Sequence, residues 1–182
     1  MFGPGAGSSF TQTMLYAPSI SIVGERLGPS LLKSGEEGVR STEACLRSCD
    51  IVGLYFGKWN KPCRGFTRKL VDSYKENNEA RRIMEIVFLS MDNDEAPFRD
   101  CFAEMPWLAV PLHEGGRRAL LARELCVTEP DLPCLILLDA RDGSTISRNG
   151  RPPSMDDLVR HKNPMMEGFA GLGAEDIDGA RM

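Results

Sequence analysis

Three short apolar runs divide the chain into segments of mixed polarity. The runs cover residues 51–56, 84–89 and 135–138, and each is almost continuously apolar. Such runs are typical of strands that are covered on both faces of a sheet. We therefore expect three buried strands, and a sheet covered on both faces needs helices on both of its sides.

Amphipathic segments lie between these runs and after them. Apolar residues recur at helical spacing over 60–78, 94–104 and 117–125, which predicts three helices, and residues 155–160 predict a closing one. An Asp-Gly pair within 142–147 predicts a hairpin that adds a fourth strand. The alternation of buried strands with helices predicts an α/β fold, with a central sheet between two helical layers.

The two ends of the chain differ from its middle. Residues 1–12 are rich in Gly, Pro and Ser, and we expect a disordered segment there. Residues 163–182 carry four acidic residues and several glycines, which predicts a flexible acidic tail. A single domain is therefore expected over residues 13–162.

Composition and charge exclude several classes of protein. The net charge of −4 provides no basic stripe, so nucleic acid and anionic membranes are not expected partners. No apolar run approaches the ~20 residues that a membrane span needs. The first basic residue is Arg26, so the start of the chain resembles no targeting signal and a cytoplasmic location is the default. In that compartment the six cysteines are expected to be mostly free thiols.

The most informative motif follows the first apolar run and reads W-N-K-P-C-R-G-F over residues 59–66. Position 60 lies at the predicted start of a helix, where the helix dipole and unpaired N–H groups would lower the pKa of a thiol. Asn60 has no thiol there, but Asn is a favoured N-cap residue, and we expect its side chain to accept the backbone N–H of Cys63. Cys63 lies one turn inside the helix, where apolar surroundings would keep its thiol protonated.

Three segments, in this order along the chain, resemble the tryparedoxins and nucleoredoxins, a branch of the thioredoxin fold. They are Tyr55-Phe56 with residues 59–67, the M-P-W-L-A-V-P run of residues 105–111, and Leu132-Pro133 with the strand after it. The match covers roughly residues 30–160, and tryparedoxins of trypanosomatid parasites look closer than animal nucleoredoxins. The resemblance implies a thioredoxin fold with a central mixed sheet, thiol–disulfide oxidoreductase ancestry in cell redox homeostasis, and neither a cofactor nor a metal.

The resemblance also implies which residues form the site. Trp59, Pro62 and Cys63 match the W-C-x-P-C motif of the family, with Cys63 at the position of the resolving cysteine. Asn60 stands where the family has its attacking cysteine, so the motif is degenerate. Pro133 matches the proline that follows a cis peptide bond in this family, and we expect the Leu132–Pro133 bond to be cis.

Four further positions match family contacts to the dithiol donor trypanothione: Met91, Asn93, Leu132 and Arg151. Met91 and Asn93 stand where the family has a Trp and a Glu, which counts against a trypanothione-type dithiol as the partner. Leu132 and Arg151 could still make the contacts to a donor that the resemblance implies for their positions. The partners that the resemblance implies are therefore thiol or disulfide proteins, or extended peptides.

These observations leave three hypotheses open. The leading one is a tryparedoxin-like protein whose dithiol turnover is weak or absent, and which binds or regulates peptides or redox proteins beside Pro133. The alternative is an active but non-standard protein-disulfide oxidoreductase that uses Cys63 alone or with Cys134. A third is an interaction module whose groove is closed by the loop before Trp59, which is one residue shorter than in the family.

The remaining cysteines are expected to serve packing. Cys45 and Cys49 are four residues apart in a predicted short helix, where they would share a face, but no histidine lies near them to complete a zinc site. Cys101 and Cys126 fit apolar positions, and we expect both in the core. Cys134 directly follows Pro133, and packing is favoured for it over a redox role with Cys63.

Overall fold

The computed structural model describes residues 22–148. The helix expected over 155–160, the contact residue Arg151 and the segments 1–12 and 163–182 lie outside this range, so these expectations and the domain limits stay predictions. The helices are α1 (Ile22–Leu27), α2 (Thr42–Leu46), α3 (Lys61–Asn78), α4 (Glu95–Phe102), α5 (Gly115–Glu124) and the 3-10 turn η1 (Glu129–Asp131). The strands are β1 (Ser30–Lys33), β2 (Val39–Ser41), β3 (Ile51–Gly57), β4 (Met84–Ser90), β5 (Leu108–Ala109), β6 (Cys134–Asp139) and β7 (Thr145–Ser147).

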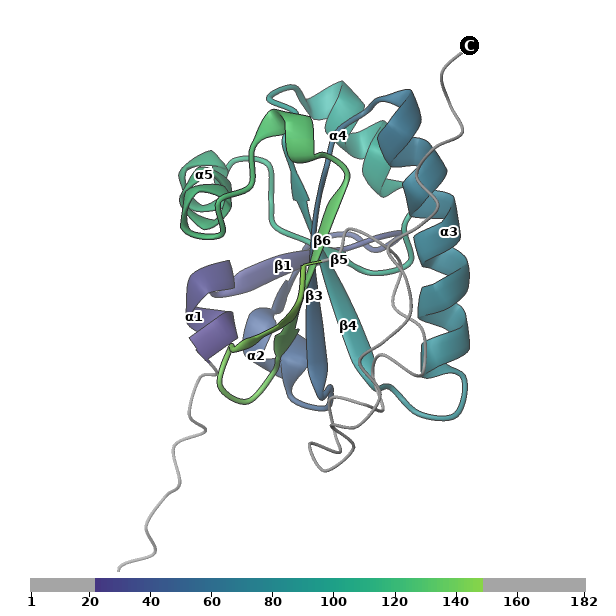
Figure 1. Cartoon of the computed structure of the whole chain (residues 1–182), viewed down its shortest axis with the longest axis vertical. Coiled ribbons are helices and arrows are strands. Elements are labelled where there is room, and N and C mark those ends of the chain that lie inside the picture. The colour runs from purple at the N-terminus through teal and green to yellow at the C-terminus, as the bar shows by residue number, and fades with distance from the viewer. Residues whose placement is uncertain (1–21, 149–182) are drawn as a thin grey trace, which may run out of the picture.

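The described part of the chain is a mixed sheet between two helical layers. The seven strands pair in the order β2-β1-β5-β4-β3-β6-β7. One apolar cluster joins α3 and α4 to one face of the sheet, and a second joins α1, α2 and α5 to the other face. Figure 1 shows α3 on the side of the strands opposite α1 and α5. The expected α/β fold with helices on both faces is confirmed.

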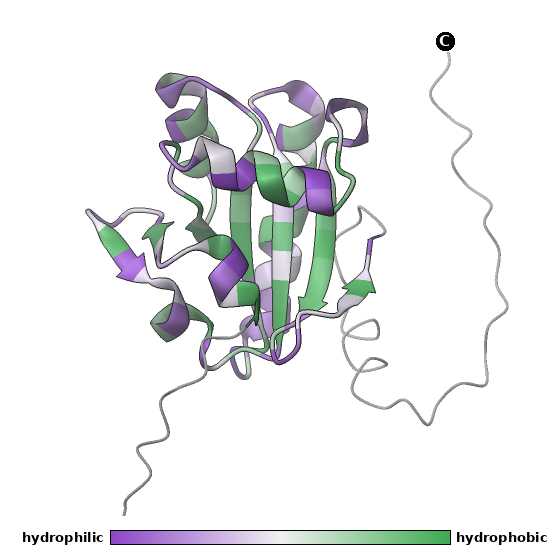
Figure 2. Ribbon diagram, turned by 90° about the vertical axis from the view of Figure 1, so that its left-hand side faces the viewer, coloured by the Kyte–Doolittle hydropathy of each residue, from purple (hydrophilic) through white to green (hydrophobic). Residues whose placement is uncertain are grey.

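The two central strands account for the long apolar runs. β3 and β4 are parallel, and every residue of both strands is buried. Leu54 and Phe56 pack toward α1 and α5, whereas Ile51 and Tyr55 pack toward α3 and α4. Figure 2 shows mostly apolar residues along the central strands, whereas the helices around them carry both polar and apolar residues. A strand covered on both faces has no polar side, which explains why its sequence does not alternate.

The apolar pattern predicted three central strands and the hairpin but missed the strands at the other edge. In β1 only Leu31 is fully buried, and the residues of β2 are all exposed. β5 has two residues, within the run 105–111. Strands this short or this exposed produce neither a continuous apolar run nor a clear alternation, so the sequence pattern contains little signal for them.

The expected helix over 60–78 is observed as α3. Its N-cap is Asn60, whose side-chain Oδ1 accepts the backbone N–H of Cys63 at 2.9 Å, as predicted. Pro62 lies in the first turn, where its missing N–H costs the helix nothing. Leu70 is buried against the sheet, and the ring of Tyr74 lies 5.5 Å from that of Trp107.

The position of Cys126 corrects one expectation. Cys126 was expected in the core but is exposed, whereas the next residue, Val127, is buried. The reason lies in the backbone, because Cys126 has a φ of +50° directly after α5 ends, and Val127 donates its N–H to the carbonyl of Ala122 at 2.8 Å. This left-handed turn takes the Cys126 side chain off the apolar stripe that its spacing from α5 suggests.

Candidate functional site

The residues of the motif and of the proline segment meet at one end of the sheet. β3 ends at Gly57, and the antiparallel β6 begins at Cys134, which pairs with Phe56. The Leu132–Pro133 peptide bond, directly before β6, is cis as expected. β4 runs parallel to β3, so the loop after Ser90 lies at the same end. The topology thus gathers the start of α3, the loop after β4 and the turn before β6.

Cys63 is covered by the residues around it. Its exposed fraction is 0%, and its Sγ accepts the backbone N–H of Lys58 at 3.5 Å. Burial raises the pKa of the Cys63 thiol above its ordinary value, while the bond from Lys58 opposes this rise and the negative charge of Asp92 adds to it. A thiol in this environment is a poor nucleophile, because the thiolate is the reactive form.

Trp59 lies at the surface and is held from two sides. Its exposed fraction is 36%, and its backbone N–H donates to Oδ2 of Asp92 at 2.9 Å. The guanidinium of Arg64 lies 4.4 Å from the centre of the indole ring and pairs with Glu104 at 3.3 Å. Sequence reasoning missed Asp92 and Arg64, although one stands between Met91 and Asn93 and the other directly follows Cys63.

The turn before β6 is tied to the loop before α3. Lys58 forms an ion pair with Glu129 in η1, and its hydrogen bond lowers the pKa of the Glu129 carboxyl. Within the turn, the backbone N–H and the hydroxyl of Thr128 both donate to Oδ2 of Asp131, at 2.7 and 2.6 Å. These contacts hold the chain segment before Pro133 next to Lys58, which directly precedes the motif.

The residues matched to donor contacts have different environments. Met91 and Leu132 are half-buried and pack against the apolar cluster under α1 and α5. Met91 also donates its backbone N–H to the carbonyl of Gly57 at 2.8 Å. Asn93 is exposed, and Arg151 lies outside the described residues. Met91 and Leu132 therefore lie at the end of the sheet where α3 begins, and both pack against apolar residues there.

Cys63 and Cys134 are carried on different sides of the sheet. Cys134 is half-buried and packs with the cluster under α1 and α5, whereas α3, which carries Cys63, covers the opposite face. Tyr55 points to the α3 side, where its hydroxyl donates to the carbonyl of Cys63 at 3.2 Å. All six cysteines are free thiols. Burial raises the pKa of Cys134 as well.

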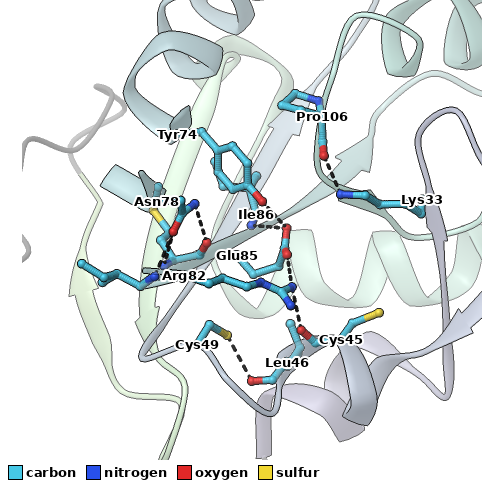
Figure 3. A network of polar contacts seen from close by, with 12 residues as sticks. Lys33, Cys45, Leu46, Cys49, Tyr74, Asn78, Arg82, Glu85, Ile86 and Pro106 are labelled. Atoms are coloured by element: carbon cyan, nitrogen blue, oxygen red, sulfur yellow. Dashed lines mark hydrogen bonds and ion pairs between the residues drawn. The ribbon is translucent and has the colours of Figure 1, made fainter. Parts of the chain in front are cut away.

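Near the opposite end of β4 lies a buried carboxylate (Figure 3). Glu85 is 1% exposed, and it accepts hydrogen bonds from the Tyr74 hydroxyl at 3.2 Å and the Ile86 backbone N–H at 3.1 Å. Arg82 forms an ion pair with the same carboxylate and donates to the carbonyl of Cys45 at 2.8 Å. The carboxylate is therefore paired and hydrogen-bonded, as a buried charge must be.

Cys45 and Cys49 belong to this structural network. Both are buried, but α2 ends at Leu46, so the short helix expected to carry the pair does not include Cys49. The Cys49 thiol donates to the carbonyl of Leu46 at 3.1 Å, and burial raises its pKa to about 11. Among residues 22–148 no cluster of His, Cys, Asp or Glu has the arrangement of a metal site.

A cavity of about 380 Å³ lies apart from the motif, between α1, α2 and α5. Arg117 lines it and donates hydrogen bonds to the carbonyls of Glu25 and Arg26 at the end of α1, at 3.3 and 3.2 Å. Its guanidinium is therefore occupied in holding α1 against α5.

In the part of the chain that the structure describes, no helix has the length and apolar character needed to cross a membrane.

Comparison with known proteins places this arrangement in a family. Residues 49–145 match a family model described as thioredoxin-like. The chain is 38% identical to human nucleoredoxin over 146 residues, which cover 77% of this chain and 32% of nucleoredoxin. It is 34% identical to tryparedoxin of Trypanosoma brucei brucei over 128 residues, which cover 70% of this chain and 83% of that protein.

The fold of solved tryparedoxins agrees with these matches. Native tryparedoxin I from Crithidia fasciculata superimposes with a TM-score of 0.61 at 30% identity, covering 84% of this chain and 99% of that one. The identity to human nucleoredoxin is higher than that to the T. brucei tryparedoxin, so these two values do not support the expected preference for tryparedoxins. The chain spans only 32% of the length of human nucleoredoxin. The protein belongs to the thioredoxin-like family and is related to nucleoredoxin and tryparedoxin.

Proposed function

We propose that this protein is a relative of the thiol–disulfide oxidoreductases whose dithiol turnover is weak or absent, and that it acts by binding extended peptides or redox proteins. The hydrogen bond from the Cys63 backbone N–H to Oδ1 of Asn60 carries this proposal. This bond holds the amide oxygen of Asn60 at the N-cap of α3. In the family that the chain resembles, the attacking sulfur is expected at this position.

The chemistry of disulfide exchange supports weak turnover. Exchange begins when a thiolate attacks a disulfide sulfur, forms a mixed disulfide and expels a thiolate, and a second thiol then resolves the intermediate. The Asn60 side chain is no nucleophile. Cys63 is fully buried with a raised pKa, so it contributes little thiolate at neutral pH. Neither Asn60 nor Cys63 is therefore suited to the attack on a disulfide sulfur.

The surroundings of the motif support a binding role. The indole of Trp59 is exposed although its backbone and ring are both held in place, so it offers a fixed apolar surface. Leu132 and Pro133 are half-buried beside the start of β6. An extended peptide can pair with backbone groups at such a strand end while its side chains contact neighbouring apolar residues.

One observation favours the alternative, an oxidoreductase that uses Cys63 alone or with Cys134. The Lys58 backbone N–H points at the Cys63 sulfur, and such a bond stabilises a thiolate. Burial outweighs it, because the pKa of Cys63 is raised overall. Pairing with Cys134 is disfavoured, because that residue packs on the face of the sheet away from α3.

Dithiol-driven reduction of insulin tests the catalytic half of the proposal. Wild type, Asn60→Cys and the matched control Asn60→Ser are compared, because Ser keeps a capping oxygen and supplies no thiolate. We expect background rates for wild type and Asn60→Ser. Asn60→Cys should gain a measurable rate, since its new thiol lies at the helix N-terminus one turn from Cys63. A wild-type rate above background would overturn the proposed weak turnover.

The binding half is tested without any redox step. Reduced, alkylated insulin B chain is titrated into the wild-type protein while the backbone amide signals are recorded by NMR. We expect shifts concentrated at Leu132, Cys134 and Trp59. Control titrations use Trp59→Ala, which removes the exposed indole and should weaken binding. An absence of shifts at these residues at millimolar peptide would count against peptide binding at this end of the sheet.

A further inference from the structure

A buried arginine on α5 reaches the loop behind the motif. Arg118 is only 7% exposed, although it lies in a helix whose other arginines are more accessible. A guanidinium is rarely buried unless its donors are satisfied, because removing the charge from water is costly. The side chain must therefore have partners that compensate for this cost.

The partners of Arg118 are backbone carbonyls from two loops. Nη1 donates to the carbonyl of Ser90, at the end of β4, and to that of Asp92 at 3.2 Å. Nη2 donates to the carbonyl of Leu112, after β5, at 2.8 Å. Burial lowers the pKa of the guanidinium, and the Asp92 charge opposes this decrease. One side chain thus joins α5 to the loops that follow two neighbouring strands.

The same loop carries the carboxylate that holds Trp59. Asp92 accepts the Trp59 N–H at 2.9 Å through Oδ2. Its own N–H donates to the Ser90 hydroxyl at 3.1 Å, and that hydroxyl lies 3.3 Å from the carboxylate. The Met91 N–H fixes the loop to Gly57. The carbonyls of Ser90 and Asp92, on either side of Met91, both face Arg118.

We propose that Arg118 is a positioning residue for the candidate site. Its buried guanidinium fixes the carbonyls of Ser90 and Asp92, and this fixes the Asp92 carboxylate against the backbone N–H of Trp59 at the entrance to α3. The importance of this entrance for binding rests on the proposed function, but the coupling between Arg118 and Trp59 does not. The planar fork of Arg can serve carbonyls on both sides, which a lysine ammonium cannot reproduce.

Hydrogen exchange at the Trp59 amide tests this coupling directly. In Arg118→Met the Trp59 amide should exchange on the order of tenfold faster and its proton signal should move upfield, because a bond to a charged acceptor loosens. Amides in the centre of β3 serve as an internal reference for global stability. The matched control is Arg123→Met, which removes an exposed arginine from the same helix and should leave the Trp59 amide unchanged.

A double-variant comparison separates positioning from a general structural role. If Arg118 acts through Asp92, Asp92→Ala and Asp92→Ala with Arg118→Met should give the same exchange rate at Trp59, after correction for global stability. Additive effects, or an unchanged Trp59 amide in folded Arg118→Met, would overturn the proposal. If Arg118→Met does not fold, Arg118→Lys carries the same comparison and should give an intermediate rate. Insulin reduction by the wild type would refute the proposed function without altering any of these outcomes.

Discussion

The N-cap of α3 gives the sharpest prediction for stability. Asn60→Ala removes the only side-chain acceptor that the structure gives the Cys63 N–H. The preceding Pro62 has no N–H, and the Arg64 N–H already bonds to the Asn60 carbonyl at 3.0 Å. Substitution of a capping residue by Ala costs ~0.5–2 kcal/mol. Because Cys63 is buried and water replaces the lost acceptor poorly, we expect about 1.5 kcal/mol, in the upper half of that range.

This loss is measurable by urea unfolding followed by circular dichroism. With a slope of ~2 kcal/mol per molar urea, the midpoint of Asn60→Ala should fall by ~0.7 M while the slope stays constant. Asn60→Ser should recover most of the loss, because Ser also caps. Asn93→Ala is the control, since it makes the same chemical change at an exposed position on a neighbouring loop. Equal midpoints for wild type and Asn60→Ala would refute the claim that Asn60 stabilises the helix start.

Three further outcomes follow from the buried groups. Under native conditions at pH 7, Cys126 should alkylate readily and Cys63 much more slowly, as peptide mass spectrometry would show, because one thiol is exposed and the other is covered; rapid labelling of Cys63 would instead favour the oxidoreductase alternative. Glu85→Ala should destabilise the fold by ~2–4 kcal/mol in urea unfolding, whereas the exposed Glu76→Ala should change it little, because the first change leaves Arg82 and Tyr74 without their buried partner. Since burial raises the pKa of Cys49 from 9.0 to about 11, the unfolded chain loses this proton first, so stability should fall as pH rises through that interval. Cys49→Ala should make the fall shallower, and an unchanged pH profile would contradict the assignment.

The central part of the fold could be predicted because its signals are local. A covered strand needs a continuous apolar run, and β3 and β4 have one. A helix against a sheet needs apolar residues at a spacing of three or four, and α3 has them at Phe66, Leu70 and Tyr74. The cap at Asn60 follows from the short-range geometry of a helix start. In each case neighbouring residues determine the structure.

The contacts around Trp59 could not be predicted in this way, because they join distant parts of the chain. Asp92 lies 33 residues from Trp59 and Arg118 lies 26 residues from Asp92. The sequence around each of these two residues contains nothing that distinguishes it from an ordinary solvent-exposed charged residue on a loop or a helix. Their roles appear only when parallel strands bring their ends together. The prediction that Cys126 is buried was wrong for a related reason. A single residue with left-handed backbone changes the direction of a side chain, and the periodicity of the sequence contains no signal for it.

The start of α3 illustrates a trade between stability and chemistry. The amide oxygen of Asn60 satisfies a buried backbone N–H, and a thiol at the same position would be a weaker acceptor. Asn60→Cys should therefore be less stable than wild type while it gains a nucleophile. Cys63 contributes a small apolar side chain to the interior whether or not a disulfide ever forms. Under the proposed function, the scaffold of the motif persists without a redox step, because Asn60 and Cys63 each have a structural role that does not depend on that step.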